Sequence, residues 1–133
     1  MTRGVRIIHF ALVIGLVLVA GVFYILRQQP GVSFGFGPSI GLIMAGIALA
    51  SLVIALGFLA PRVPQRPADQ TPDVYWTRNE IRGAAIILWA MVEGAALLSW
   101  LGYLLTGTWG PAAVGLLAIA ALTLLRPARL EGS

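Results

Sequence analysis

The chain has 133 residues, of which 59% are hydrophobic and only 11% are charged, with a formal net charge of +4. Soluble domains carry roughly twice this share of charged residues, so the composition excludes an ordinary soluble protein. All nine basic residues are arginine, and cysteine is absent, which excludes disulfides and thiolate chemistry. The arginines flank apolar runs, so we expect a lipid bilayer as the partner and no nucleic acid.

A helix that crosses a bilayer needs about 20 mostly apolar residues. Four apolar runs occur in the chain, at 7–26, 40–60, 83–105 and 109–125, and the last of them is short. The first run is longer than the apolar part of a signal peptide, and no clear cleavage site follows it. We therefore predict a single all-α domain over 1–133, a four-helix transmembrane bundle whose first helix is retained.

The arginines also predict an orientation. Eight of them flank one side of the predicted spans, and only Arg27 flanks the other. Because positive residues favour the cytoplasmic side, we expect both termini and the connector 61–82 to be cytoplasmic. We expect the protein in a bacterial inner membrane.

The connector is rich in proline and polar residues, which predicts an irregular, solvated segment. Thr77 stands three residues before Glu80, the spacing of a capping box. The spacing predicts that the third helix begins at Arg78, with Thr77 as its N-cap. The aromatic residues before the cap are expected at the lipid headgroups: Tyr75 and Trp76.

The first and third spans are similar to each other. When 7–26 is aligned with 86–105, eight of twenty positions are identical. If the match reflects duplication, the bundle consists of two tandem parallel helical hairpins. Ile14 occupies the position of Glu93 in this alignment, so only one half would carry the carboxylate.

Glu93 is the single charged residue in the stretch LWAMVEGAALLSW at 88–100. An acidic residue at the centre of a spanning helix costs about 2.5–3.5 kcal/mol on insertion scales, and Glu93 is too central to reach the interface. The predicted spans contain no arginine to pair with it. Desolvation without a cation favours the protonated form, so we expect an enclosed, often neutral carboxyl. Glu80 and Glu131 are expected to be exposed and ionised.

Three interpretations of Glu93 stay open. A protonated carboxyl could join helices by a hydrogen bond to a backbone carbonyl or to a hydroxyl such as that of Ser51. It could instead bind and release a proton. A cation site is the third alternative, but the spans offer few other side-chain oxygens. A metal site is not expected, because one histidine and one distant carboxylate are too few ligands.

Three further residues belong to the candidate site. His9, the sole histidine, is expected about two turns below Glu93 if the first and third helices lie side by side. It either faces headgroups or a backbone oxygen, or marks the point where a proton passes toward Glu93. Trp89 and Trp100 share the helical face of Glu93. They are expected to pack or to contact lipid, and in both cases to shield the carboxyl from water.

The segment WAMVEGAALLSWLGYLL resembles the carboxylate-bearing helix of the rotary ATP synthase c subunit, the proteolipid. In residues 88–105, Glu93 matches the ion-binding carboxylate of that family, and Gly94 matches the small residue after it. The run 40–60 lacks the dense glycine series of the family, and the connector is longer. The resemblance therefore implies proton binding at Glu93 rather than a place in a rotor ring.

The sequence shows no phosphate-binding loop, catalytic triad or metal-ligand set, so we expect neither an enzyme nor a cofactor. The first hypothesis is a proton-handling or transport-associated subunit built around Glu93. The alternative is a non-catalytic scaffold or accessory subunit of a larger membrane complex, with Glu93 as a hydrogen-bonding link between helices. Both hypotheses imply a homo-oligomer or other membrane subunits as partners.

Overall fold

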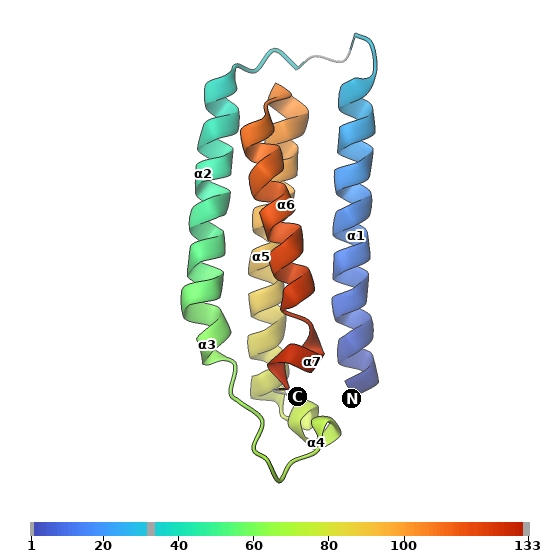
Figure 1. The fold of residues 1–133 in the computed structure, drawn as a ribbon, viewed down its shortest axis with the longest axis vertical. Coiled ribbons are helices and arrows are strands. Elements are labelled where there is room, and N and C mark those ends of the chain that lie inside the picture. The colour runs from blue at the N-terminus through green and yellow to red at the C-terminus, as the bar shows by residue number, and fades with distance from the viewer. Residues whose placement is uncertain (1, 32–33, 132–133) are drawn as a thin grey trace.

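A computed structural model describes residues 2–31 and 34–131, and within these ranges all regular structure is helical. The elements are α1 (Thr2–Gln28), α2 (Pro38–Ile54), the π-helical η1 (Ala55–Leu59), α3 (Ala60–Arg62), α4 (Pro72–Thr77), α5 (Asn79–Thr106), α6 (Trp109–Leu124) and α7 (Pro127–Leu130). The N-terminal end of α1 lies at the same end of the molecule as α4 and α7 (Figure 1). We call this end, which carries most of the arginines, the basic end.

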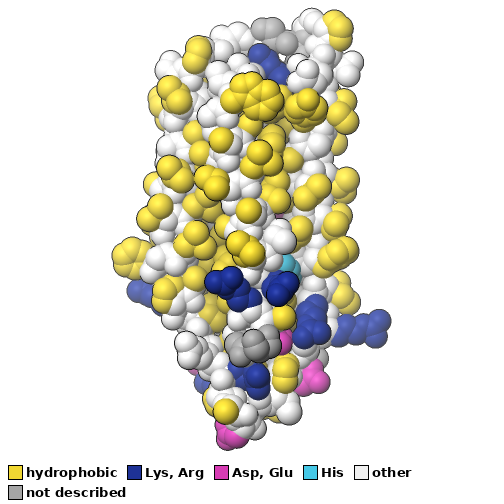
Figure 2. Space-filling model, viewed as in Figure 1, with side chains coloured by type: hydrophobic (Ala, Val, Ile, Leu, Met, Phe, Trp, Pro, Cys, Tyr) yellow, Lys and Arg dark blue, Asp and Glu magenta, His cyan; other side chains and the backbone are white. Residues whose placement is uncertain are grey.

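Three helical rods are long and apolar enough to cross a membrane: Thr2–Gln28, Pro38–Arg62 and Asn79–Thr106. Their outward faces carry exposed large apolar side chains, such as Phe10 and Leu42, each 66% exposed. In Figure 2 such side chains cover most of the visible face, whereas arginines gather mainly near its lower end. Soluble proteins rarely expose apolar surface on this scale, so this is the surface of a membrane protein.

The helix α5 is central in the fold. It packs against α1, α2 and α6, and α6 also contacts α1 and α2. The helices α1 and α2 lie on opposite sides of the α5–α6 pair (Figure 1). The expected pair of equivalent hairpins is therefore not found: α5 and α6 pack directly after a tight turn, whereas a longer loop lets α1 and α2 lie apart.

Small residues on one face of α2 bring it close to its neighbours. Gly41, Ala45 and Ala48 are buried at the spacing of a single helical face. A Cβ added at Gly41 would lie 2.7 Å from Oγ1 of Thr106 and 2.8 Å from Oγ1 of Thr108. Small side chains at Gly41 and Ala45 thus allow close contact between α2 and its neighbours.

The turn from α5 to α6 depends on Gly107 and on Arg27. Gly107 has φ +69° and ends α5 in the left-handed conformation, which favours glycine. The Arg27 guanidinium donates to the carbonyls of Leu104 at 3.5 Å and Thr106 at 3.3 Å. These carbonyls lie in the last turn of α5. The positive charge of Arg27 therefore also interacts favourably with the negative end of the helix dipole.

The connector 61–82 is more ordered than the sequence predicts. The Ala60 N–H donates to the carbonyl of Ala55, five residues back, which makes the π-helical turn before Pro61. A proline ring crowds the carbonyl four residues before it, and a local widening relieves this. Further along, the Thr71 hydroxyl accepts a hydrogen bond from the Val74 N–H at 3.3 Å and caps α4.

The prediction that Thr77 caps the third long helix is wrong. Thr77 is the last residue of α4, and its hydroxyl donates to the Val74 carbonyl at 2.6 Å. The helix α5 begins at Asn79, one residue later than predicted, and its N-cap residue Arg78 makes no side-chain cap. The capping hydroxyl must belong to the residue directly before the helix, and Thr77 is still part of the preceding one.

Tyr75 and Trp76, which the sequence predicts at the headgroups, are fully buried in the protein. Their rings meet edge to face at 4.9 Å, and Trp76 also lies 6.4 Å from Trp89 of α5. Aromatic pairs of this kind stabilise beyond the area they bury. The short helix α4 is therefore folded onto the bundle and closes its basic end.

Candidate functional site

Glu93 lies near the middle of α5. It is half-buried, between a buried row that contains Trp89 and Trp100 and an exposed row that contains Ala90 and Leu97. The expected enclosure of this carboxyl is therefore not found. The helical period of 3.6 residues places Glu93 at the border between the interior and the lipid-facing surface.

Glu93 makes no hydrogen bond or ion pair with any residue in the described ranges. The hydroxyl of Ser51, considered as its partner, donates instead to the Ile47 carbonyl of its own helix at 3.0 Å. The Ser99 hydroxyl is buried without a partner, but it stands about 120° away from Glu93 around α5. Within the described part of the chain the carboxyl thus lacks the partner that a link between helices requires.

His9 is buried in α1, and its Nε2 lies 2.7 Å from the Leu122 carbonyl oxygen. A carbonyl can only accept, so Nε2 carries the proton. The ring also packs against Trp89, with centroids 5.0 Å apart. Of the two alternatives for His9, the contact with a backbone oxygen is found. No contact in the described part of the chain joins it to Glu93.

The two tryptophans differ in what their indole nitrogens do. Nε1 of Trp89 donates to the Leu125 carbonyl at 2.8 Å, at the end of α6. His9 and Trp89 together satisfy two carbonyls that a helix end leaves without partners. Nε1 of Trp100 is buried with no partner, and the indole packs against Gly115. Both side chains pack inside, and their shielding of Glu93 stays a prediction.

A cavity of about 280 Å³ lies between α1 and α5. Asn79 and Arg82 line it near the start of α5, and Ile86 and Trp89 line it further along. Nε of Arg82 is buried and has no hydrogen-bond partner among the residues that the structure describes, so the cavity offers a polar group to water. The cavity reaches Trp89, which is one helical turn before Glu93.

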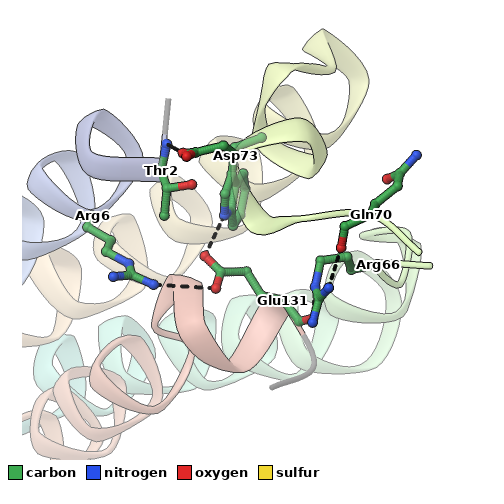
Figure 3. A network of polar contacts seen from close by, with 7 residues as sticks. Thr2, Arg6, Arg66, Gln70, Asp73 and Glu131 are labelled. Carbon is green, nitrogen blue, oxygen red and sulfur yellow. Dashed lines mark hydrogen bonds and ion pairs between the residues drawn. The ribbon is translucent and has the colours of Figure 1, made fainter. Parts of the chain in front are cut away.

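Glu131 is the carboxylate that the structure buries. It is 3% exposed, which overturns the expectation that it is exposed. Its Oε1 accepts a hydrogen bond from Nε1 of Trp76 at 2.6 Å, and its Oε2 lies 3.5 Å from Nη2 of Arg6 (Figure 3). Its backbone carbonyl accepts from Nε of Arg66 at 3.0 Å. Glu131 thus ties α1, the connector and α4 to the end of the chain.

The pKa values of two groups at the basic end, Tyr75 and Asp73, differ from their usual values. Burial raises the pKa of the Tyr75 hydroxyl above its usual value, and the charge of Glu131 raises it further. The same hydroxyl donates to the Pro64 carbonyl at 2.5 Å. Hydrogen bonding by Thr2 lowers the pKa of Asp73, whose Oδ1 accepts from the Thr2 N–H at 3.2 Å (Figure 3). These contacts hold the basic end together, beside an open hollow of about 620 Å³ that Thr2, Arg6 and Asp73 line.

Sequence reasoning missed Glu131 because nothing local marks it. It follows the last apolar run in a polar segment, and its partners lie 55 and 125 positions earlier in the chain. Among the described residues, no group of three or more His, Cys, Asp or Glu could hold a metal ion.

Comparison of the chain with models of known families, with curated proteins and with solved structures finds no match. The resemblance of residues 88–105 to the c subunit therefore stays a prediction.

Proposed function

We propose that this chain is a small multi-pass membrane protein that binds and releases a proton at Glu93 as a transport-associated subunit. The observation that carries the proposal is a mid-helix carboxyl without a partner among the described residues. A charged carboxylate at this depth is costly. A proton removes that charge and needs no other ligand.

The cavity between α1 and α5 is the proposed route from the basic end. Its Asn79 and Arg82 end can hold water, and its Trp89 end is one turn from Glu93. His9 was the other candidate for the place where a proton passes, but its Nε2 proton is engaged by the Leu122 carbonyl. We therefore assign His9 to holding the end of α6.

The proposal includes four spans with both termini in the cytoplasm. The helix α6 has 16 residues, or about 24 Å, which is short for a bilayer core of about 30 Å. Three crossings would leave the end of α5 across the membrane from Arg6. Because Arg6 contacts Glu131, a crossing by α6 is the arrangement that this contact supports.

The alternative function is a scaffold or accessory subunit of a larger membrane complex. Two observations favour it: the wide apolar surface, and the position of Glu93 at the border of that surface. A carboxyl there could hydrogen-bond to a helix of a second subunit. In that case an amide would replace it without loss of function.

Carbodiimide labelling tests proton binding, because the reagent attacks protonated carboxyls. We expect Glu93 to be modified, and faster as pH falls from 8 to about 6. Glu80, whose side chain is 63% exposed, serves as the exposed control. Glu131 must be followed separately because it is buried, and Glu131→Gln identifies its contribution. If Glu93 resists the reagent at every pH, it does not carry an exchangeable proton.

A second experiment separates the two functions. The protein and Glu93→Gln are reconstituted in vesicles, and proton flux is followed with a pH-sensitive dye. Glu93→Gln should fold normally and abolish proton-linked flux. Ile86→Trp, which fills the cavity, should slow flux more than Ile87→Trp at an exposed position outside it. Equal flux in all four proteins would favour the scaffold.

Single cysteines test the orientation. Asp69→Cys in the connector and Gly35→Cys in the loop before α2 are treated in intact cells with an impermeant thiol reagent. Only Gly35→Cys should react, because the arginines place Asp69 inside. The reverse pattern would invert the proposed topology.

A further inference from the structure

An apolar groove of about 400 Å³ lies between α2 and α6. Leu49 of α2 and Leu56 of the following η1 line one wall, and Leu117 and Leu124 line the other from α6. Each pair is seven residues apart, so the groove follows the helices for about 10 Å. A slot of this length and chemistry matches part of an extended acyl chain.

A second hollow of about 370 Å³ adjoins the groove toward the basic end. Leu56, Leu125 and Arg129 line both spaces, and Gln65 lines only the second. The order along the groove is thus apolar slot, guanidinium, then amide. Arg129 is exposed, and it forms no ion pair with a described carboxylate.

This order of groups is complementary to a phospholipid, whose acyl chain is followed by a phosphate and then by a polar headgroup. Arg62 and Arg126 are also exposed at the basic end, and their charge favours an anionic headgroup. We infer that an anionic phospholipid binds this groove, with one acyl chain between α2 and α6 and its phosphate on Arg129. The site is distinct from Glu93 and does not depend on proton binding there.

Native mass spectrometry of the full chain in detergent tests the inference. The probes are phosphatidylglycerol and phosphatidylcholine with identical acyl chains. Phosphatidylglycerol should bind more tightly, and Arg129→Gln should weaken it by about fivefold, the effect of one arginine at an anionic lipid. Arg126→Gln makes the same change of charge outside the groove and should weaken it by no more than about twofold.

The apolar part of the site is tested from both walls. Ala120→Phe on α6 and Val53→Phe on α2 fill the groove and should each lower phosphatidylglycerol binding several-fold. Ala113→Phe, an exposed position on α6 outside the lining, should not. Thermal unfolding of each variant identifies any loss of fold. If one of the two groove variants does not fold, the binding measured for the other decides the result.

Three results would overturn the inference. The first is equal binding of the two lipids. The second is that Arg129→Gln binds phosphatidylglycerol as tightly as Arg126→Gln does, or that the groove variants bind it as tightly as Ala113→Phe does. The third is displacement of phosphatidylglycerol by an equal concentration of glycerol phosphate, which would assign the basic residues to a free phosphate ester rather than to a lipid.

Discussion

Glu93 and Glu131 lie in opposite settings, and the contrast reverses what their sequence surroundings predict. Glu93 stands among apolar residues, yet it is half-buried and has no partner among the described residues. Glu131 stands in a polar tail, yet it is 3% exposed and accepts hydrogen bonds from Trp76 and Arg6. A carboxylate can be buried where the fold brings hydrogen-bond donors to it. For Glu131 these donors come from segments that are distant in the sequence.

The difference suggests two roles. At the basic end, the carboxylate of Glu131 joins α1 and α4 to the end of α7 and so helps to close the bundle. In the middle of α5, the polar group of Glu93 contributes nothing visible to the stability of this chain. A group that costs free energy without a structural return is a candidate for function, which is why the proposal rests on Glu93.

Replacing the two carboxylates should give the largest contrast. Glu131→Ala should lower the free energy of unfolding by about 2–3 kcal/mol, because the buried indole N–H of Trp76 loses a charged acceptor. Glu131→Gln keeps an acceptor and should cost about half as much. Glu93→Gln should cost less than about 0.5 kcal/mol. Chemical unfolding in detergent measures all three, and equal losses at Glu93 and Glu131 would break the comparison.

The two tryptophans of α5 allow a matched test. Trp89→Phe removes the hydrogen bond to the Leu125 carbonyl, whereas Trp100→Phe removes an N–H that has no partner. Both lose a similar volume, so the difference between them reports the hydrogen bond. We expect Trp89→Phe to be less stable than Trp100→Phe by about 1–2 kcal/mol. The reverse order in thermal unfolding would contradict the assignment of Trp89 as a clamp on α6.

The correction at Thr77 predicts a smaller difference. Thr71→Ala removes the N-cap of α4 and should destabilise its packing by about 0.5–1 kcal/mol. Thr77→Ala should change stability by less than about 0.5 kcal/mol. Hydrogen exchange of the amides in 73–77 distinguishes them. Faster exchange at the start of α5 in Thr77→Ala would restore the capping role that the structure denies.

The weakest expected effect is a pH dependence at Asp73. Its pKa is lowered by hydrogen bonding from Thr2, so its contribution is present above the unfolded-state pKa of about 3.9. The contribution is lost as pH falls through the lower, folded-state value. Trp76 fluorescence should therefore change slightly below about pH 4, and Asp73→Asn should abolish that change. An identical acid response in the variant would show that Asp73 is not its source.

The helices themselves could be read from composition. The predicted runs 7–26, 40–60 and 83–105 lie within the three long helical rods of the structure. The predicted ends of these runs differ from the ends of the helices. Features such as the cap at Gly107 and the extension of α1 to Thr2 depend on contacts with other segments. The proline content of the connector predicts an irregular segment, and the short helix α4 within it forms because packing on the bundle stabilises it.

Composition and hydropathy are enough to predict that this chain is helical and suited to a membrane, because a long apolar run can satisfy its backbone in lipid only as a helix. They also locate the one carboxyl within such a run, Glu93. Which polar groups meet follows from the packing of the helices. The pairing of Glu131 with Trp76, of His9 with Leu122, and of Arg27 with the end of α5 joins residues at least 55 positions apart. Such contacts depend on how the helices pack, and helical periodicity alone leaves that choice open.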